Sequence, residues 1–209
     1  MAVAKHLQTV GADFFAVSSV AEAVQLRQAG IDDPILLLGH TPTALYREVL
    51  EYGLRPAIFD ENEAKALSEM TAQVGRSARI HLVVDTGMGR YGFLPTEIDR
   101  ILSIYRYLTN LHVTGTYTHY ANAFKSVKKT QEQLDAFNTV VEKIRAAGFE
   151  PGMLHASNSE AMFGCKTPNL DAVRIGSALG GRVIAKGDHG LQRTGKLQSQ
   201  ITEVRWLPT

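Results

Sequence analysis

The stretch IHLVVDTGMGR, residues 80–90, leads from an apolar run typical of a buried strand into a glycine-rich loop that ends in an arginine. A second stretch, AVRIGS at residues 172–177, places an arginine and small residues at the end of another such run. In parallel α/β proteins, ligand-binding residues gather where strands end and loops begin. The two stretches therefore indicate parallel strands with a functional site at their carboxyl ends.

Strand-like and helix-like segments alternate on both sides of these stretches. Apolar runs typical of strands occupy residues 14–17, 35–38, 56–59, 80–85, 112–119, 153–157 and 172–175. Segments with helical periodicity or capping signals occupy residues 3–10, 19–30, 41–53, 60–70, 95–108 and 130–147. Most of the runs lack the polar–apolar alternation of a half-exposed strand, so we expect a parallel sheet covered by helices.

Two architectures fit this alternation, an open doubly wound sheet and a (β/α)8 barrel. The open sheet is disfavoured because no glycine-rich fingerprint follows the first strand. The chain starts in a helix, so we expect an incomplete TIM-type barrel with about seven of the eight strand–helix units, over residues 1–195. Residues 196–209 are interpreted as a linker and the first strand, residues 201–206, of an absent C-terminal β-domain. The outermost strands of such a barrel would have unpaired edges.

Composition limits the possible partners and the compartment. The 209 residues can bury one substantial core, and their 22 basic and 21 acidic side chains give a net charge of +1. This balance argues against a nucleic-acid partner, which needs a basic excess. Cys165 is the single cysteine and favours a reducing compartment. No signal peptide and no apolar run of about 18 residues is present. We therefore expect a cytoplasmic protein with no membrane segment and no metal site in these residues.

The candidate site residues lie at the carboxyl ends of the expected strands: Leu38, Arg90, Tyr117, His119, Asn158, Ser159, Arg174, Gly176 and Ser177. The turn at residues 174–177 offers closely spaced N–H groups for a phosphate, although an ordinary glycine turn would look the same. Arg174 needs a partner or a ligand, and a buried salt bridge is the alternative. His119 could be a base or a hydrogen-bonded core histidine. Arg90 suits a carboxylate or a phosphate.

Four segments together resemble the signature motifs of alanine racemases. DTGMGRYGF at residues 85–93 resembles the family's DTGMGRxGF, and YTHYA at residues 117–121 resembles its YTHFA. HASNS at residues 155–159 resembles HxxNS, and VRIGSA at residues 173–178 resembles VRxGxA. The motifs occur in family order across essentially the whole chain.

The resemblance implies the barrel portion of a pyridoxal-5′-phosphate (PLP)-dependent racemase that interconverts L- and D-alanine, or serine, for cell-wall synthesis. It implies that Arg174 bonds the pyridine nitrogen of the cofactor and that His119 lies beside the ring. The phosphate would be held by Asn158, Ser159, Gly176 and Ser177, and the pocket lined by Leu38 and Tyr117. Arg90 would contact the cofactor's phenolic oxygen and the substrate carboxylate. The catalytic residues in this chain would thus be Arg90 and His119.

The chain also departs from the family pattern. The family's Schiff-base lysine lies in a VVKANAYGHG-like segment directly before a helix that resembles residues 2–10, and that segment is absent. The second acid/base, a tyrosine from the partner subunit's β-domain in the homodimeric enzymes, is absent too. Val83 stands where many members carry a modified lysine. Because racemization needs a base on each face of the α-carbon, we expect this chain alone to be inactive, without covalently attached cofactor. The alternatives are a non-catalytic PLP-binding protein and a degenerate structural barrel.

Overall fold

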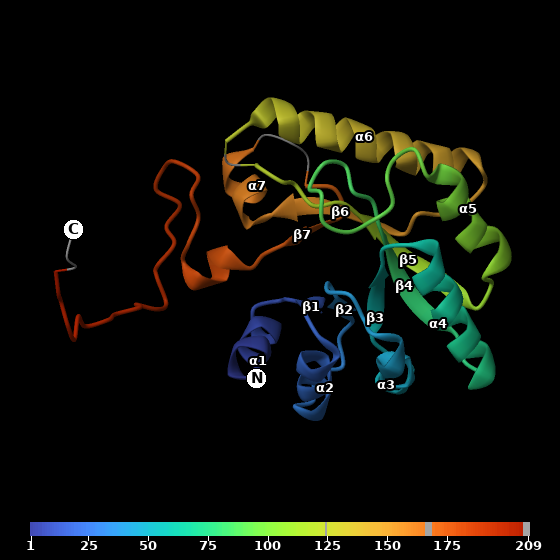
Figure 1. Ribbon diagram of the computed structural model, residues 1–209, viewed down its shortest axis with the longest axis horizontal. Coiled ribbons are helices and arrows are strands. Elements are labelled where there is room, and N and C mark those ends of the chain that lie inside the picture. Colours follow the sequence, from blue (N-terminus) through green and yellow to red (C-terminus); the bar gives the residue numbers. More distant parts are fainter. Residues whose placement is uncertain (124, 166–168, 207–209) are drawn as a thin grey trace.

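The computed structural model describes residues 1–123, 125–165 and 169–206. Its seven strands form one parallel sheet in which the spatial order follows the chain order. The strands are β1 (Phe15–Val17), β2 (Ile35–Leu37), β3 (Arg55–Ile58), β4 (Ala78–Val83), β5 (Leu111–Tyr117), β6 (Met153–Asn158) and β7 (Ala172–Arg174). The sheet curls on itself with helices outside (Figure 1), so the expected incomplete α/β barrel is confirmed.

The helices alternate with the strands. They are α1 (Ala2–Thr9), α2 (Val20–Gln28), the 3₁₀ helix η1 (Thr43–Leu45), α3 (Tyr46–Glu51), α4 (Glu61–Gln73), α5 (Ile98–Tyr107), α6 (Val127–Ala146), α7 (Ser159–Gly164) and the 3₁₀ helix η2 (Ser177–Gly180). Ser19 and Glu22 form the predicted capping box at the start of α2. Helix α6 starts at Val127 rather than at residue 130, because the Ser126 hydroxyl accepts a hydrogen bond from Lys129 N and caps the helix there.

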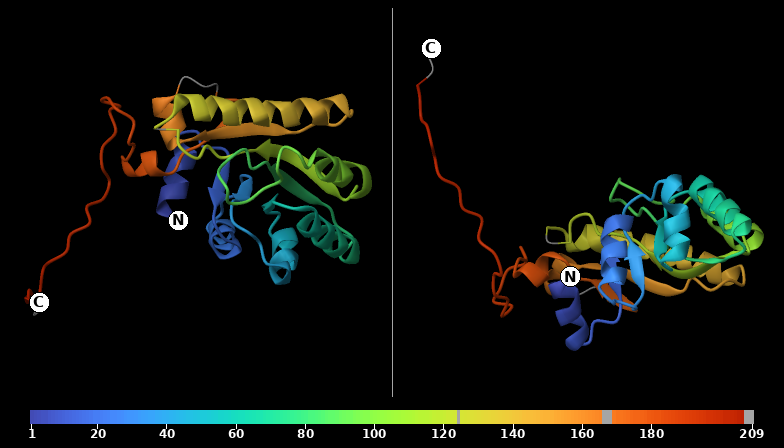
Figure 2. Two further views of the ribbon diagram at one scale, coloured as in Figure 1. Left: turned by 45° about the horizontal axis from the view of Figure 1, so that its top comes forward. Right: turned by 90° about the horizontal axis from the view of Figure 1, so that it is seen from below.

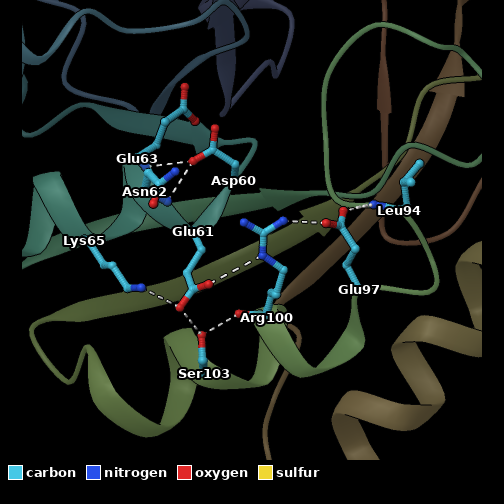
Figure 3. Close-up of polar contacts among 9 residues, drawn as sticks. All are labelled: Asp60, Glu61, Asn62, Glu63, Lys65, Leu94, Glu97, Arg100 and Ser103. Atoms are coloured by element: carbon cyan, nitrogen blue, oxygen red, sulfur yellow. Dashed lines mark hydrogen bonds and ion pairs between the residues drawn. The ribbon is translucent and has the colours of Figure 1, made fainter.

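Strands β2 to β6 are mostly buried, as their composition predicts, whereas the edge strands β1 and β7 are more exposed. Ile80 and Leu82 of β4 belong to the large apolar cluster that also contains buried residues of α4, α5 and α6. A smaller apolar cluster includes Leu36, Val83 and Tyr117 from three different strands. On the surface, Arg100 of α5 forms ion pairs with Glu61 of α4 and with Glu97 just before α5, and Lys65 pairs with Glu61 within α4 (Figure 3).

The barrel is open between its first and last strands. Within the described ranges, β1 pairs only with β2, and β7 pairs only with β6. A cavity of about 1180 Å³ is lined by residues of both edge strands, among them Ala16 and Val173. The predicted unpaired edges are therefore present, and we refer to the gap between β1 and β7 as the seam.

Residues 201–206, predicted as the first strand of a second domain, are exposed and form no strand in this structure. The C-terminal segment runs away from the barrel (Figures 1 and 2), so no neighbouring strand offers it hydrogen bonds. Residues 207–209, the end of the same prediction, lie outside the described residues. The assignment of residues 196–209 to a second domain stays a prediction.

Candidate functional site

All nine candidate site residues line the 1180 Å³ cavity. The strand ends explain this, because β2, β4, β5, β6 and β7 are parallel and deliver their last residues, or the loops that follow, to the same end of the barrel. The residues brought together are Leu38, Arg90, Tyr117, His119, Asn158, Ser159, Arg174, Gly176 and Ser177. The nine residues therefore share one cavity, while their forming a functional site, and the role of each, stay predictions.

Arg174, the last residue of β7, is held by neutral groups. Its Nη2 donates to the carbonyl oxygens of Thr118 at 2.8 Å and Ala156 at 3.0 Å, and its Nη1 lies 2.8 Å from His155 Nδ1. The guanidinium also lies over the Tyr117 ring, 4.8 Å from the ring centroid. No carboxylate within the described ranges forms an ion pair with Arg174. The salt-bridge alternative is therefore wrong for the described residues, and the positive charge is free to meet a ligand.

His119 is kept neutral by its surroundings. Burial, and then the charges of Arg174 and Arg90, lower its pKa to about 4. Its Nδ1 lies 3.3 Å from Arg174 Nη2, and its Nε2 lies 3.3 Å from the side-chain nitrogen of Asn158. A neutral imidazole can accept a hydrogen bond from only one of these two donors, and a ring placed between them is suited to orienting neighbouring groups or a ligand ring.

Asn158 and Ser159 link β6 to β7 at the mouth of the barrel. The Asn158 side-chain oxygen accepts from Ala161 N at 3.0 Å and caps α7. The Ser159 hydroxyl oxygen accepts from Gly176 N at 3.0 Å and from Ala178 N at 3.3 Å. A Cβ added to Gly176 would meet no atom within 4 Å. The turn after β7 thus has open space in front of it, where a ligand oxyanion could approach.

Arg90 belongs to a loop that is organised by a single carboxylate. Asp85 accepts hydrogen bonds from the backbone N–H groups of Gly87, Met88, Gly89 and Arg90 at 2.8–3.1 Å. Although burial raises it, these four donors bring the pKa of the Asp85 carboxyl below its ordinary value. Arg90 is exposed, and its guanidinium lies 5.9 Å from the Tyr91 ring centroid. Val83, at the position singled out in the sequence, is apolar and buried, so its side chain offers Arg90 no hydrogen bond. The side chain that shapes this loop through hydrogen bonds is that of Asp85.

Two buried histidines in the barrel interior were not predicted as site residues. His81 Nδ1 lies 3.0 Å from His155 Nε2, and His155 in turn contacts Arg174. Burial, followed by nearby arginine charges, lowers the pKa of His81 to about 3 and that of His155 well below its ordinary value. Gly115 makes room for the pair, since a Cβ there would lie 2.4 Å from His81 Cε1. The available signal was a histidine alternating with apolar residues inside a strand.

The electrostatics of the cavity favour an anionic ligand. Arg90 and Arg174 both line it, and within the described part of the chain neither forms an ion pair. Three acids lie on the wall: Glu160 accepts from the N–H of Ile184, Asp171 accepts from that of Leu154, and Asp13 is exposed to solvent. None of the described lining residues is a lysine. The described residues contain no cluster of metal-ligating side chains, and none of the described helices is long and apolar enough to cross a membrane.

Comparison with known proteins gives a consistent result. Residues 1–182 match the family described as alanine racemase, N-terminal domain. Alanine racemase of Carboxydothermus hydrogenoformans is 35% identical over 211 residues, covering 99% of the chain and 57% of that protein. Alanine racemase of Geobacter sulfurreducens is 33% identical over 214 residues, covering 99% and 56%. The structure of alanine racemase from Clostridium difficile 630 superposes with a TM-score of 0.85 at 30% identity, covering 91% of the chain and 54% of that structure. The chain spans about half the length of the relatives it matches.

Proposed function

Because the chain belongs to the alanine racemase family, in its N-terminal domain, we propose that it is the PLP-binding barrel portion of an amino-acid racemase. The substrate would be alanine or serine, and the product D-amino acid would serve cell-wall synthesis. The observation that carries the proposal is the pair of arginines, Arg90 and Arg174, that face one cavity without carboxylate partners among the described residues. A phosphorylated, ring-shaped ligand would supply negative charge for these arginines and an aromatic face to lie beside Tyr117 and His119.

The residues of the cavity fit such a ligand. Arg174 would donate to the pyridine nitrogen, and because guanidinium is already a full cation that nitrogen would stay unprotonated. His119, neutral at physiological pH, would lie beside the ring. Asn158, Ser159, Gly176 and Ser177 would hold the phosphate through hydroxyl and N–H groups, where Gly176 leaves open space. Leu38 and Tyr117 would line the pocket, and burial raises the pKa of Tyr117 to about 12, so its phenol stays neutral.

Bound PLP would supply an electron sink that acidifies the α-proton of an amino acid. Arg90, exposed at the rim, would bind the substrate carboxylate and the cofactor's phenolic oxygen. Racemization also needs a base on each face of the α-carbon. The family uses a lysine and a tyrosine for this purpose, and neither His119 nor any described lysine takes their place. We therefore propose that these 209 residues bind the cofactor reversibly and do not racemize amino acids alone. The complete enzyme would be a cytoplasmic homodimer that completes the site.

The test is PLP titration of the purified 209-residue chain, followed by visible absorbance, borohydride reduction and peptide mass mapping. We expect a reversible spectral change and no trapped adduct on the chain. Arg174→Met should weaken binding at least about tenfold, the equivalent of one charge-assisted hydrogen bond. Arg106→Met, on the exposed face of α5, is the matched control and should change nothing. Circular dichroism checks that both variants fold.

A second arm adds a synthetic peptide, VVKANAYGHG, to the PLP-loaded chain. If the seam accepts the family's lysine segment, borohydride should trap an adduct on the peptide lysine, and Arg174→Met should reduce its yield. Absence of any spectral change would contradict the PLP proposal and leave a structural barrel. An adduct on one of the chain's own lysines would contradict the predicted absence of covalent attachment. Reversible binding without trapping in either arm would support a non-catalytic PLP-binding protein.

A further inference from the structure

Gln133 is a buried polar residue on the apolar face of α6. Its side chain is 6% exposed, and the other large buried residues on that face are Leu134, Phe137, Val140, Val141 and Ile144. Burying an amide costs free energy unless its donors and its acceptor are hydrogen-bonded. The hydrogen-bond partners of the Gln133 amide therefore indicate what this residue does. Neither the sequence motifs nor the proposed cofactor contacts account for this residue.

The Gln133 amide joins the two loops that follow β4 and β5. Its Nε2 donates to Thr86 Oγ1 at 3.3 Å, in the segment 85–90 that we refer to as the Arg90 loop. The same nitrogen donates to His119 O at 3.2 Å, and Oε1 accepts from Ala121 N at 3.0 Å, both in the segment 118–121, the His119 loop. Gly87 of the Arg90 loop also packs against the Gln133 side chain, since a Cβ there would lie 3.8 Å from its Cγ.

Among the residues that the structure describes, no other buried amide ties these loops together in the same way. Asp85 organises the Arg90 loop internally, through that loop's own N–H groups. Across the two loops, the Thr86 and Thr118 hydroxyls form one hydrogen bond of 2.7 Å, and the Thr86 hydroxyl is the group to which Gln133 donates. Thr86, Thr118 and Gln133 therefore form one connected tie between the loops.

We infer that Gln133 is a positioning residue that fixes the Arg90 loop relative to the His119 loop, and so sets where Arg90 stands with respect to His119 and Arg174. Its effect on ligand binding rests on the proposed function, because it acts on the cofactor only through those residues. Its effect on the loops does not rest on that function. The two effects can therefore be measured separately.

Two substitutions separate the donor and acceptor roles of the amide. Gln133→Glu keeps an oxygen that can accept from Ala121 N but removes the donor to Thr86 and to His119 O. Gln133→Met has a similar length and removes all three hydrogen bonds. Gln131→Met is the matched control on the same helix, where the exposed Gln131 side chain donates to Asp135 and contacts neither loop through a hydrogen bond among the described residues.

Amide hydrogen exchange of the full chain tests the positioning role. We expect exchange at Ala121 to accelerate on the order of tenfold in Gln133→Met and to stay near wild type in Gln133→Glu. Residues 87–90 should exchange faster in both variants, because each loses the donor to Thr86. Unchanged exchange in both loops in Gln133→Met, with the control also unchanged, would overturn the inference.

Affinity for two probes tests the consequence for the site. PLP affinity should fall about tenfold in Gln133→Met and Gln133→Glu. Affinity for inorganic phosphate should not change, because the proposed phosphate residues lie at the end of β6, at the start of α7 and in the turn after β7 rather than in the two loops. Equal loss of both probes would indicate general destabilisation and contradict a positioning role. If the wild-type chain binds no PLP while the exchange results hold, the proposed function fails and the positioning role stands.

Discussion

Acidification should destabilise this barrel through histidines that fold in the neutral form. His81 and His155 are 0% and 1% exposed, and His119 is partly buried at the site. Burial is the main cause that lowers their pKa values, to about 3 for His81, about 4 for His119 and well below the ordinary value for His155. The unfolded chain titrates them near pH 6.5, so it binds more protons than the folded chain below that pH. Stability is therefore complete above about pH 6.5 and falls as the pH decreases toward the folded pKa values.

The magnitude follows from the number of protons taken up on unfolding. Between pH 7 and pH 5.5 each neutral buried histidine lowers the free energy of unfolding by about 1 kcal/mol, so the three together lower it by about 3–4 kcal/mol. That is a large part of the 5–15 kcal/mol typical of a domain. The interval stays above the ordinary carboxylate range, so the effect of Asp and Glu groups is small.

Urea unfolding at several pH values measures this dependence. Circular dichroism should be the probe, because the single tryptophan, Trp206, is 95% exposed in the C-terminal segment and does not report on the barrel. His81→Phe should remove about a third of the pH dependence, while His112→Gln, at an exposed position on β5, should leave it unchanged. A decrease below about 1 kcal/mol over the interval, or an unchanged dependence in His81→Phe, would refute neutral burial of these histidines.

Two further predictions concern stability alone. Gly152→Ala should destabilise by about 2–4 kcal/mol, because Gly152 has φ +68° and an added Cβ would lie 2.3 Å from the Thr114 carbonyl carbon. Gly148→Ala, at φ +84° but in open space, should cost only about 1–2 kcal/mol in urea unfolding, and equal costs would contradict the steric argument. Arg100→Ala breaks the surface ion pairs shown in Figure 3, yet the urea midpoint should not shift measurably because the pairs are solvated; a clear decrease would show that they act as a network.

The fold, and the gathering of the candidate site residues at one end of the barrel, were predictable from local sequence patterns. Apolar runs separated by capped helices predict parallel strands, and parallel strands must bring Arg90, His119 and Arg174 to the same end. These inferences need only periodicity and topology. The segment at residues 201–206 failed the same reasoning, since its apolar residues predict a strand but a strand forms only where a neighbour supplies hydrogen bonds.

The contacts that hold the candidate site residues in place were not predictable from local sequence patterns. His81 contacts His155 across strands that are 74 residues apart in sequence, and Gln133 reaches two loops from a neighbouring helix. Asp85 belongs to a quoted motif, but only the loop geometry reveals that it caps four N–H groups. Such contacts depend on side-chain direction in three dimensions, which spacing along the chain does not encode.

The seam also has a consequence for how cooperatively the chain holds together. Since every strand pairs only with its neighbours in sequence, the described sheet lacks the one contact that would join the two ends of the barrel. The apolar cluster around β1 and β2 is separate from the larger cluster around β4 and β5. Such a sheet resembles an open linear array more than a ring, with stability built from nearest-neighbour contacts. Opening of β1 and β2, together with α1 and α2, would break the pairing of β2 with β3 and the packing of Leu36 against Val83 and Tyr117, but no strand pairing across the seam.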